Sequence, residues 1–263
     1  MKKIFLLTLI IIMSLILASC GSKSNDEVIV GMELAYPPFE MTDEQGKPSG
    51  ISVEMAYALG DYLGKDIKIE NMAWSGLIPA LTSGKIDMIL SSMTITEERE
   101  KTIDFSDPYC KSYLAILFNK NSKAQSIEDL NAAGMKLAVK RGSTAHIYAV
   151  DNLPLAELVI FEKEDACVLE VVNGNADAFI YDQMTIFKNW QNYPDYTRAD
   201  LSGFQNDFEY WGIAVREGDK DFLNEINSFI SEYKENGGFD TLSDKYLTDI
   251  KNTFKELNIP FFF

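Results

Sequence analysis

The most distinctive stretch of this sequence is residues 91–109, which read Ser-Ser-Met-Thr-Ile-Thr-Glu-Glu-Arg-Glu-Lys-Thr-Ile-Asp-Phe-Ser-Asp-Pro-Tyr. The apolar run 86–90 immediately before them predicts a short buried strand. Thr96, followed by two glutamates, predicts a helix start with a threonine N-cap and an acidic first turn. Small hydroxyl residues at the end of a strand, with Arg99 one turn into a helix, make a good anion site. Hydroxyls, backbone N–H groups and a guanidinium all donate to a carboxylate.

Arg99 is the most informative residue of this stretch, because the dipole of a helix mildly disfavours a cation in its first turn. Helix stability therefore does not explain why an arginine stands there. One interpretation is a residue that binds a carboxylate. The alternative is a solvated arginine paired with a neighbouring glutamate, an arrangement that is common and contributes little. The spacing alone leaves both open.

The same stretch resembles the signature of the bacterial solute-binding proteins for amino acids, the extracellular family 3 of periplasmic or lipid-anchored receptors of ABC importers. Their pattern, S-x-T-I-T-x-x-R followed by F-S-x-P-Y, is similar to the sequence from Ser92 to Tyr109. The resemblance implies that Arg99, with Ser92 and Thr94, holds the α-carboxylate of a free amino acid. Ser91, next to this pair, is included among the expected ligand-binding residues.

The resemblance also implies an α/β fold of the periplasmic-binding-protein type II-like kind, with two α/β lobes joined by a two-strand hinge. Alternation of strands and helices runs through both halves of the chain, which predicts parallel sheets. We expect residues 28–111 and 208–263 to form a discontinuous lobe 1 and residues 112–207 to form lobe 2. A ligand held between the lobes would draw them together.

The first 20 residues have the pattern of a secretory signal. A basic start precedes the apolar run 4–18, which is shorter than the roughly 20 residues that a membrane span needs. Leu17-Ala-Ser-Cys20 resembles the lipobox of bacterial lipoproteins, which implies cleavage and lipidation at Cys20. Residues 21–27 then read as a polar, flexible tether. We therefore expect a protein outside the cytoplasm, in the periplasm or on the outer face, held to the cell membrane by its lipid only.

Composition narrows the class of protein further. The 263 residues are 46% hydrophobic, which suits a globular protein with a real core, and carry a formal net charge of −16. Strong acidity argues against nucleic acid or an anionic membrane surface as a partner. The single histidine, His146, leaves little material for metal sites or catalytic triads, so no metal and no cofactor are expected. Cys110 and Cys167 fall in different predicted lobes, which disfavours a disulfide without deciding the question.

Three residues before residue 91 are candidates for the ligand site. The diproline of residues 31–39 fixes a rigid loop after a first strand. The resemblance implies that Tyr36 in this loop packs on the ligand and that Trp74 forms the other half of an aromatic clamp. A flat indole suits the stem or cationic head of a side chain. Glu33 matches a carboxylate that reads a polar or cationic side chain in some relatives. Simple packing of the rings, and an exposed glutamate, are the alternatives.

Two further groups of candidates lie in the second half of the chain. Lys140-Arg-Gly-Ser-Thr144 follows a strand and opens a helix, so its hydroxyls favour a carboxylate, although they also suit an ordinary N-cap. The resemblance implies that Ser143 and Thr144 contact the carboxylate from lobe 2, and Lys140 is included in the site. Asp182 ends a strand, where open α/β sheets place ligand contacts. In relatives it takes the α-ammonium, and it also suits the N-cap of the next helix.

The function expected from these residues is an extracytoplasmic receptor, without enzymatic activity, that passes an amino acid to a membrane permease. We expect a monomer and favour a polar or cationic ligand such as arginine, lysine or glutamine. A dehydratase acting on cyclohexadienyl substrates, with Glu33 as the general acid, is one alternative. A sensor that reports closure to a signalling partner and a purely structural lipoprotein are the others. The terminal residues 260–263 are expected to pack back on lobe 1, because three exposed phenylalanines would form an adhesive patch.

Overall fold

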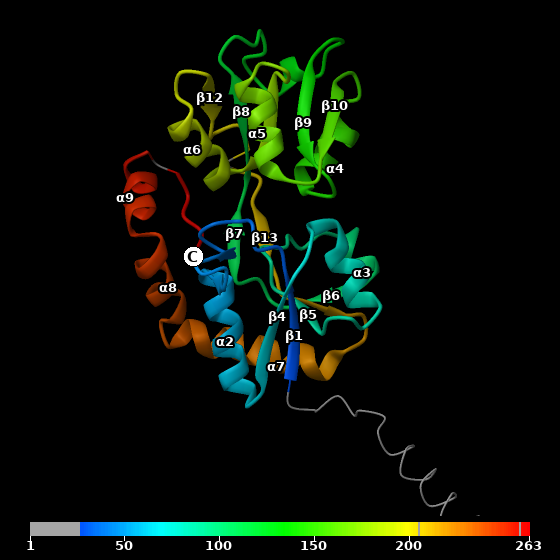
Figure 1. Cartoon of the computed structure of the whole chain (residues 1–263), viewed down its shortest axis with the longest axis vertical. Coiled ribbons are helices and arrows are strands. Elements are labelled where there is room, and N and C mark those ends of the chain that lie inside the picture. The colour runs from blue at the N-terminus through cyan, green and yellow to red at the C-terminus, as the bar shows by residue number, and fades with distance from the viewer. Residues whose placement is uncertain (1–26, 205, 258) are drawn as a thin grey trace, which may run out of the picture.

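The computed structural model of the protein describes residues 27–204, 206–257 and 259–263, and Figure 1 shows two α/β bodies joined by a narrow connection. The predicted signal 1–20, the lipidation site Cys20 and most of the predicted tether lie outside the described residues. Glu27, the last residue of that predicted tether, already belongs to the first strand.

The first body, called lobe 1 below, is built on a five-stranded sheet with the order β4-β1-β5-β14-β6. Its strands are β1 (Glu27–Met32), β4 (Asp66–Asn71), β5 (Met88–Ile89), β6 (Ile103–Phe105) and β14 (Ala214–Arg216), and a small hairpin joins β2 (Met41–Thr42) to β3 (Pro48–Ser49). Its helices are α2 (Ile51–Leu63), α3 (Leu77–Thr82), α7 (Lys220–Glu235), α8 (Gly238–Tyr246) and α9 (Thr248–Glu256). As the apolar stripe of the sequence predicts, α2 buries Val53, Met55 and Leu59.

The second body, called lobe 2 below, is built on a separate five-stranded sheet with the order β10-β9-β11-β8-β12. Its strands are β8 (Leu114–Asn119), β9 (Lys136–Lys140), β10 (Glu157–Phe161), β11 (Ala178–Asp182) and β12 (Thr197–Asp200). Its helices are α4 (Thr144–Asn152), α5 (Glu164–Val172) and α6 (Gln183–Asn192). Two separate sheets support the lobe boundaries that we propose, 28–111 with 208–263 for lobe 1 and 112–207 for lobe 2.

Two short antiparallel strands connect the lobes. β7 (Cys110–Ser112) leads into β8 of lobe 2, and β13 (Glu209–Trp211) returns the chain to β14 of lobe 1. The sequence predicts one continuous return strand over 208–215, but the structure breaks it at Gly212. A side chain there would lie 3.0 Å from Ile95, so glycine lets the chain pass close to its neighbour while it changes pairing partner.

The expectation of parallel sheets is only partly correct. Strands β4, β1 and β5 are parallel in lobe 1, and β10, β9 and β11 are parallel in lobe 2. However, β14 runs antiparallel to β5 and β6, and β8 runs antiparallel to β11 and β12. These two strands follow the connecting strands β13 and β7. Strands β14 and β8 therefore enter their sheets from the hinge side, and they run opposite to the parallel strands of each sheet.

Local structure departs from the sequence-based expectation at two places. The helix predicted after Thr96 is only a short 3₁₀ turn, Arg99–Lys101, although the Thr96 hydroxyl does accept a hydrogen bond from the Arg99 N–H at 3.3 Å. At the other end of the chain, two helices were expected after residue 220, and the structure adds a third, α9. Phe254 is its buried residue, and Ile250, one turn earlier, packs partly against the same core.

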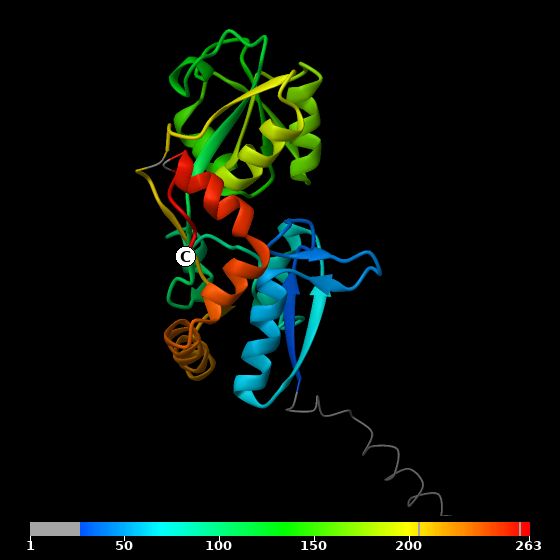
Figure 2. The same cartoon turned by 90° about the vertical axis from the view of Figure 1, so that its left-hand side faces the viewer.

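The C-terminal phenylalanines pack back on lobe 1, as expected. Phe262 is 1% exposed, its ring lies 5.3 Å from that of Phe39, and its carbonyl accepts a hydrogen bond from the Lys111 N–H of β7. The preceding helix α9 reaches lobe 2, since the rings of Phe254 and Phe187 of α6 lie 5.5 Å apart. Figure 2 shows α9 leaning against the upper body. The end of the chain thus braces the hinge from one side.

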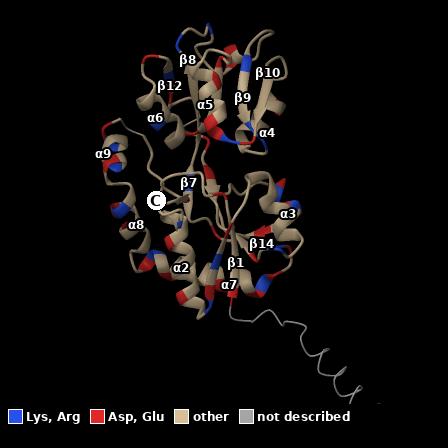
Figure 3. Cartoon of the chain, in the orientation of Figure 1, with Lys and Arg blue, Asp and Glu red and all other residues tan. Residues whose placement is uncertain are grey.

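The cysteines, the lengths of the helices and the distribution of charge complete the description of the fold. Cys110 and Cys167 are both buried and unpaired, so the structure has no disulfide between them. Within the described ranges, no helix is long and apolar enough to cross a membrane. Figure 3 shows acidic and basic residues on the helices of both lobes, so the excess of acidic residues is spread over the molecule.

Candidate ligand-binding site

A cavity of about 50 Å³ lies where the two lobes meet, next to the hinge. Every ligand-binding residue predicted from the sequence lines it. They are Glu33, Tyr36, Trp74, Ser91, Ser92, Thr94 and Arg99 from lobe 1, and Lys140, Ser143, Thr144 and Asp182 from lobe 2. The cavity is also lined by Glu40, Leu114, Tyr181, Glu209 and Trp211, which the sequence analysis did not select. The structure therefore brings together residues from distant parts of the chain into one site.

Arg99 is a buried cation, not a solvated surface residue. Its side chain enters the cavity from the 3₁₀ turn and donates to the carbonyl of Thr94 at 2.6 Å and to that of Gly142, from lobe 2, at 3.1 Å. The guanidinium carbon also lies 5.4 Å from the centre of the Trp74 ring. Burial lowers the pKa of Arg99 to about 10, so it stays charged at neutral pH. A guanidinium has five N–H donors, so capacity remains for a ligand carboxylate.

The small hydroxyl residues that follow β5 donate hydrogen bonds to a buried acid, Glu40. Ser92 donates to Glu40 at 3.1 Å, and Ser91 donates to it at 3.4 Å while accepting the backbone N–H of Glu33 at 2.9 Å. Ser92 has a φ of 50°, a conformation that is uncommon for a residue other than glycine. Ser91 and Ser92 therefore line the cavity but already have protein partners.

Lys140 links the two lobes through a chain of charges. Its ammonium pairs with Glu33 of lobe 1 and with Glu164 of lobe 2, the latter at 2.9 Å. Its side chain is 1% exposed. Burial by itself lowers the pKa of Lys140, but contact with Tyr181 and with the two carboxylates outweighs burial and raises it. Glu33, expected to read a ligand side chain, is therefore already paired with a cation of the protein.

Asp182 combines the two roles that the sequence allows. One carboxylate oxygen accepts the backbone N–H of Thr185 at 3.0 Å, which makes Asp182 the N-cap of α6. The other oxygen, Oδ2, is buried and makes no hydrogen bond to a described residue, although the hydroxyl of Tyr36, which also makes none, lies near this carboxyl group. Burial raises the pKa of Asp182, and the nearby Tyr36 hydroxyl and the Thr185 N–H partly oppose this. Such an acceptor is costly to bury alone, so it suits a donor from a ligand.

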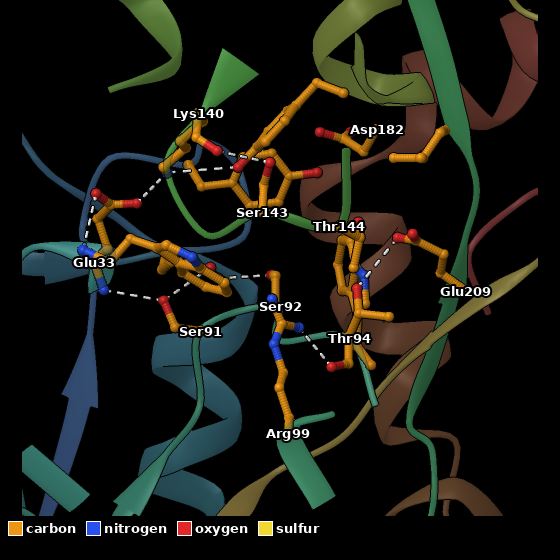
Figure 4. Close-up of a pocket in the computed structure, with 16 residues that line it drawn as sticks. Glu33, Ser91, Ser92, Thr94, Arg99, Lys140, Ser143, Thr144, Asp182 and Glu209 are labelled. Atoms are coloured by element: carbon orange, nitrogen blue, oxygen red, sulfur yellow. Dashed lines mark hydrogen bonds and ion pairs between the residues drawn. The ribbon is translucent and has the colours of Figure 1, made fainter. Parts of the chain in front are cut away.

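The N-terminus of α4 presents two hydroxyls that differ in their partners. Ser143 is the N-cap of this helix, because it accepts the backbone N–H of His146 at 3.1 Å and donates to the carbonyl of Lys140 at 2.9 Å. Its hydroxyl is thus engaged in the turn. Thr144, the first helical residue, instead lies beside Glu209 of the hinge (Figure 4). The hydroxyl of Thr144 is thus directed at Glu209, whereas that of Ser143 is held within the turn.

Of the five cavity residues that sequence reasoning missed, Glu40 and Glu209 are the two acids. Glu40 is 1% exposed, and burial raises its pKa to about 8, although hydroxyl groups around it act in the opposite direction. Glu209 accepts a hydrogen bond from Thr94 at 3.2 Å. Glu40 directly follows the diproline loop, a signal that was present in the sequence. Within the part of the chain that the structure describes, no group of three His, Cys, Asp or Glu residues is placed to hold a metal ion.

Two α/β lobes, a two-strand hinge and a charged cavity between the lobes define a solute-binding protein of the kind that closes around a small ligand. The sequence model of the bacterial extracellular solute-binding proteins, family 3, matches residues 28–249. The chain belongs to this family, whose members act outside the cytoplasm.

Characterised relatives match almost the whole chain. An L-arginine-binding protein of Pseudomonas aeruginosa is 32% identical over 94% of this chain and 97% of its own length. The glutamine-binding protein of an ABC transporter of Bacillus subtilis is 31% identical over 95% of this chain and 98% of its own length. The relatives therefore differ from one another in the amino acid that they bind.

Solved structures confirm the predicted fold. An ancestral arginine-binding protein bound to arginine has a TM-score of 0.77 and 34% identity, over 85% of this chain and 99% of that chain. An ancestral amino acid-binding protein described as a precursor of cyclohexadienyl dehydratase has a TM-score of 0.75 and 35% identity, over 85% of this chain and 96% of that chain.

Proposed function

We propose that the protein is an extracytoplasmic receptor that binds a free α-amino acid between its lobes and delivers it to the permease of an ABC importer. The observation that carries this proposal is the pair Arg99 and Asp182, which line one cavity from opposite lobes. Arg99 is a buried cation with donors to spare, and Asp182 has a buried oxygen without a partner. The carboxylate and ammonium of a zwitterion satisfy both, and buried charges are tolerable when paired in this way.

The α-carboxylate would bind Arg99 together with the hydroxyls of Thr94 and Thr144, one from each lobe. The α-ammonium would bind Oδ2 of Asp182. Because these groups belong to different lobes, a bound amino acid favours the closed arrangement over the open one. Tyr36 and Trp74 would contact the ligand side chain, since both rings line the cavity.

Lys140 favours a neutral polar side chain over a cationic one. Its ammonium already pairs with Glu33 and lies 5.6 Å from the centre of the Trp74 ring, where a ligand cation was expected. A second cation there would be repelled. A carboxamide can accept from the ammonium of Lys140 and donate to the carboxylate of Glu33, so we propose glutamine as the preferred ligand, ahead of arginine and lysine.

A thermal-shift screen of residues 22–263 against the twenty amino acids tests this function. A ligand at 100 times its dissociation constant adds about 2.7 kcal/mol of stability, which gives an easily measured shift in Tm. We expect the largest shift with glutamine and no shift for Arg99→Ala. A shift that survives in Arg99→Ala would place the carboxylate elsewhere, and no shift with any amino acid would refute the proposed function.

Dehydration of a cyclohexadienyl substrate is the second candidate, favoured by the similarity to the ancestral dehydratase precursor. Glu33, the general acid expected from the sequence, is ion-paired with Lys140. The carboxyl group of Glu33 is therefore held by a buried cation of the protein and is not free to approach a leaving hydroxyl. We expect no turnover of prephenate above the uncatalysed rate, and measurable turnover would reopen this candidate.

We also propose that lipidation of Cys20 anchors the mature protein, as a monomer, to the cell membrane. The support is the lipobox-like sequence before Cys20. Cys20→Ser should release the protein from the membrane fraction of the expressing cells. Wild-type and Cys20→Ser proteins in the same fraction would contradict the anchor.

A further inference from the structure

Glu209 of the hinge strand β13 points into the cavity at the place proposed for the α-carboxylate. Thr94 of lobe 1 donates to its Oε2 at 3.2 Å. Burial raises the pKa of Glu209, whereas hydrogen bonds from Thr144 and Thr94 and the charge of Arg99 lower it. Figure 4 shows Glu209 beside Thr144 and Thr94, with Arg99 below them. The hinge thus brings a carboxylate to the hydroxyl of Thr94 and near Thr144 and Arg99, the side chains proposed to bind the ligand carboxylate.

Two carboxylates cannot share these donors at low cost. Among the groups that shift the pKa of Glu209, Arg99 is the cation. A ligand carboxylate placed beside the carboxylate of Glu209 would add electrostatic repulsion in a buried site. The hydroxyl of Thr94 has one proton, so it can donate to only one acceptor at a time. An amino acid carboxylate therefore cannot bind here while the side chain of Glu209 stays in its present place.

We propose that Glu209 is an internal competitor, whose side-chain carboxylate occupies the subsite for the ligand α-carboxylate and must be displaced when an amino acid binds. The inference rests on the proposed function. It assigns to the hinge a direct part in setting affinity. The apparent dissociation constant of a ligand increases as the fraction of protein ready to bind it decreases, and Glu209 lowers that fraction.

The backbone around Glu209 allows such a displacement without movement of the strand. The carbonyl of Tyr210 accepts the Ile95 N–H at 2.8 Å, and β13 stays paired with β7. The exposed neighbours Phe208 and Tyr210 face away from the cavity, because side chains alternate across a strand, but Glu209 is itself only partly buried and so already borders solvent. Rotation of the Glu209 side chain alone can therefore carry its carboxylate out of the subsite.

Glu209 also joins the two lobes, because Thr94 belongs to lobe 1 and Thr144 to lobe 2. The ligand carboxylate would make the same connection once it replaces Glu209. Removal of the Glu209 carboxylate should therefore strengthen binding, whereas removal of a group that contacts the ligand weakens it. This difference in direction makes the inference testable.

Isothermal titration with the amino acid that gives the largest thermal shift tests it, on residues 22–263 of wild-type, Glu209→Ala, Glu209→Gln and Asp207→Asn proteins. Asp207 is an exposed acid of the same segment and controls for the change in net charge. We expect at least tenfold tighter binding for Glu209→Ala, equal to 1.4 kcal/mol. Glu209→Gln, which keeps the shape and can still accept from Thr94, should show a smaller gain, and Asp207→Asn should bind like wild type.

The outcomes separate the two proposals. If wild type binds the amino acid and both Glu209 variants bind it equally or more weakly, the inference is overturned and the proposed function still stands. Weakened binding would mean that Glu209 contacts the ligand, for example its ammonium. An equal gain in Asp207→Asn would assign the effect to net charge and also overturn the inference. Failure of wild type and of every variant to bind any of the twenty amino acids refutes both proposals.

Discussion

Glu40 is a buried carboxyl group whose neighbours are hydroxyls and not a bound cation. Ser52 donates to it at 2.7 Å and Ser92 at 3.1 Å. Burial raises the pKa of Glu40 from its ordinary value of 4.5 to about 8, and these hydroxyls oppose the rise. The folded protein therefore keeps the Glu40 proton through neutral pH, whereas the unfolded chain releases it near pH 4.5. Between about pH 4.5 and pH 8 the folded protein therefore holds one proton at Glu40 that the unfolded chain does not.

We predict that Glu40→Gln becomes more stable relative to wild type as the pH rises from 5 to 8. Over this range the folded state of wild type binds one proton more than the unfolded state, so its free energy of unfolding falls with rising pH. The slope from this one group is at most about 1.4 kcal/mol per pH unit. A glutamine has no proton to lose, so the variant lacks this slope.

Urea denaturation of both proteins at pH 5 and pH 8 measures the effect, and Glu44→Gln is the matched control because Glu44 is exposed in the neighbouring turn. Glu44→Gln should keep the pH dependence of wild type. Parallel stability curves for wild type and Glu40→Gln would show that Glu40 is ionised in the folded protein at neutral pH.

At the scale of single elements, helix α6 begins at a residue that also serves the cavity. Asp182 caps α6 through the Thr185 N–H, and its second oxygen faces the site. We predict that Asp182→Asn weakens amino acid binding strongly but leaves stability nearly unchanged, because asparagine caps a helix as well as aspartate does. Asp182→Ala should lose both functions, with about 1 kcal/mol of stability lost with the cap.

Titration calorimetry and urea denaturation on the same samples separate the two roles of Asp182. A loss of binding in Asp182→Asn of about 2–5 kcal/mol is expected when one partner of a buried charge pair is removed. Full binding by Asp182→Asn would assign the ammonium to another acid and reduce Asp182 to a helix cap.

The C-terminal segment 259–263 acts as a brace for lobe 1 and the hinge. The ring of Phe262 packs on Phe39, on Trp211 of β13 and on Phe254 of α9. We predict that Phe262→Ala costs about 3–5 kcal/mol of stability, as truncation of a buried phenylalanine usually does. Phe263→Ala is the control, since Phe263 is only partly buried and stacks on Phe239. Equal unfolding midpoints in urea for the two variants would contradict a bracing role of Phe262.

The sequence predicted elements well where a local pattern carries the signal. The periodic stripe of α2 and the strand-to-helix junctions at Ser143 and Asp182 follow from residue spacing and capping chemistry. The break at Gly212 depends on its contact with the distant Ile95, which no local pattern encodes. Glu40 directly follows the diproline loop, but its burial, like the position of Glu209 in the cavity, arises only when hinge, loop and lobes pack together.

At the scale of the whole molecule, polar contacts across the cleft hold the lobes together. Trp74 donates to the carbonyl of Gly142 at 3.3 Å, Lys188 donates to that of Pro37 at 3.2 Å, and Lys140 pairs with Glu33. Of these, the last is the most buried, and it also connects to Glu164. Lys140 separates two carboxylates that belong to different lobes and would otherwise repel one another as the lobes close.

We therefore predict that Lys140→Met shifts the protein without ligand toward an open arrangement and changes its ligand preference. Methionine keeps the length of the side chain but leaves Glu33 and Glu164 without their shared cation, and uncompensated buried charges are costly. Opening separates the two acids and exposes them to water. Small-angle X-ray scattering should show a larger radius of gyration than for wild type. Arginine or lysine, which bring a cation to the same place, should close the variant and bind it more tightly than glutamine.

Lys136→Met is the matched control for this prediction, because Lys136 lies on the same strand β9 and pairs with Glu157 at the exposed surface. Surface pairs contribute little, so this variant should scatter like wild type and keep its ligand preference. If Lys140→Met stays as compact as wild type, closure does not depend on the charge chain. If it is open but still prefers glutamine, Lys140 governs closure alone, and other residues of the cavity must set the preference for glutamine over arginine and lysine.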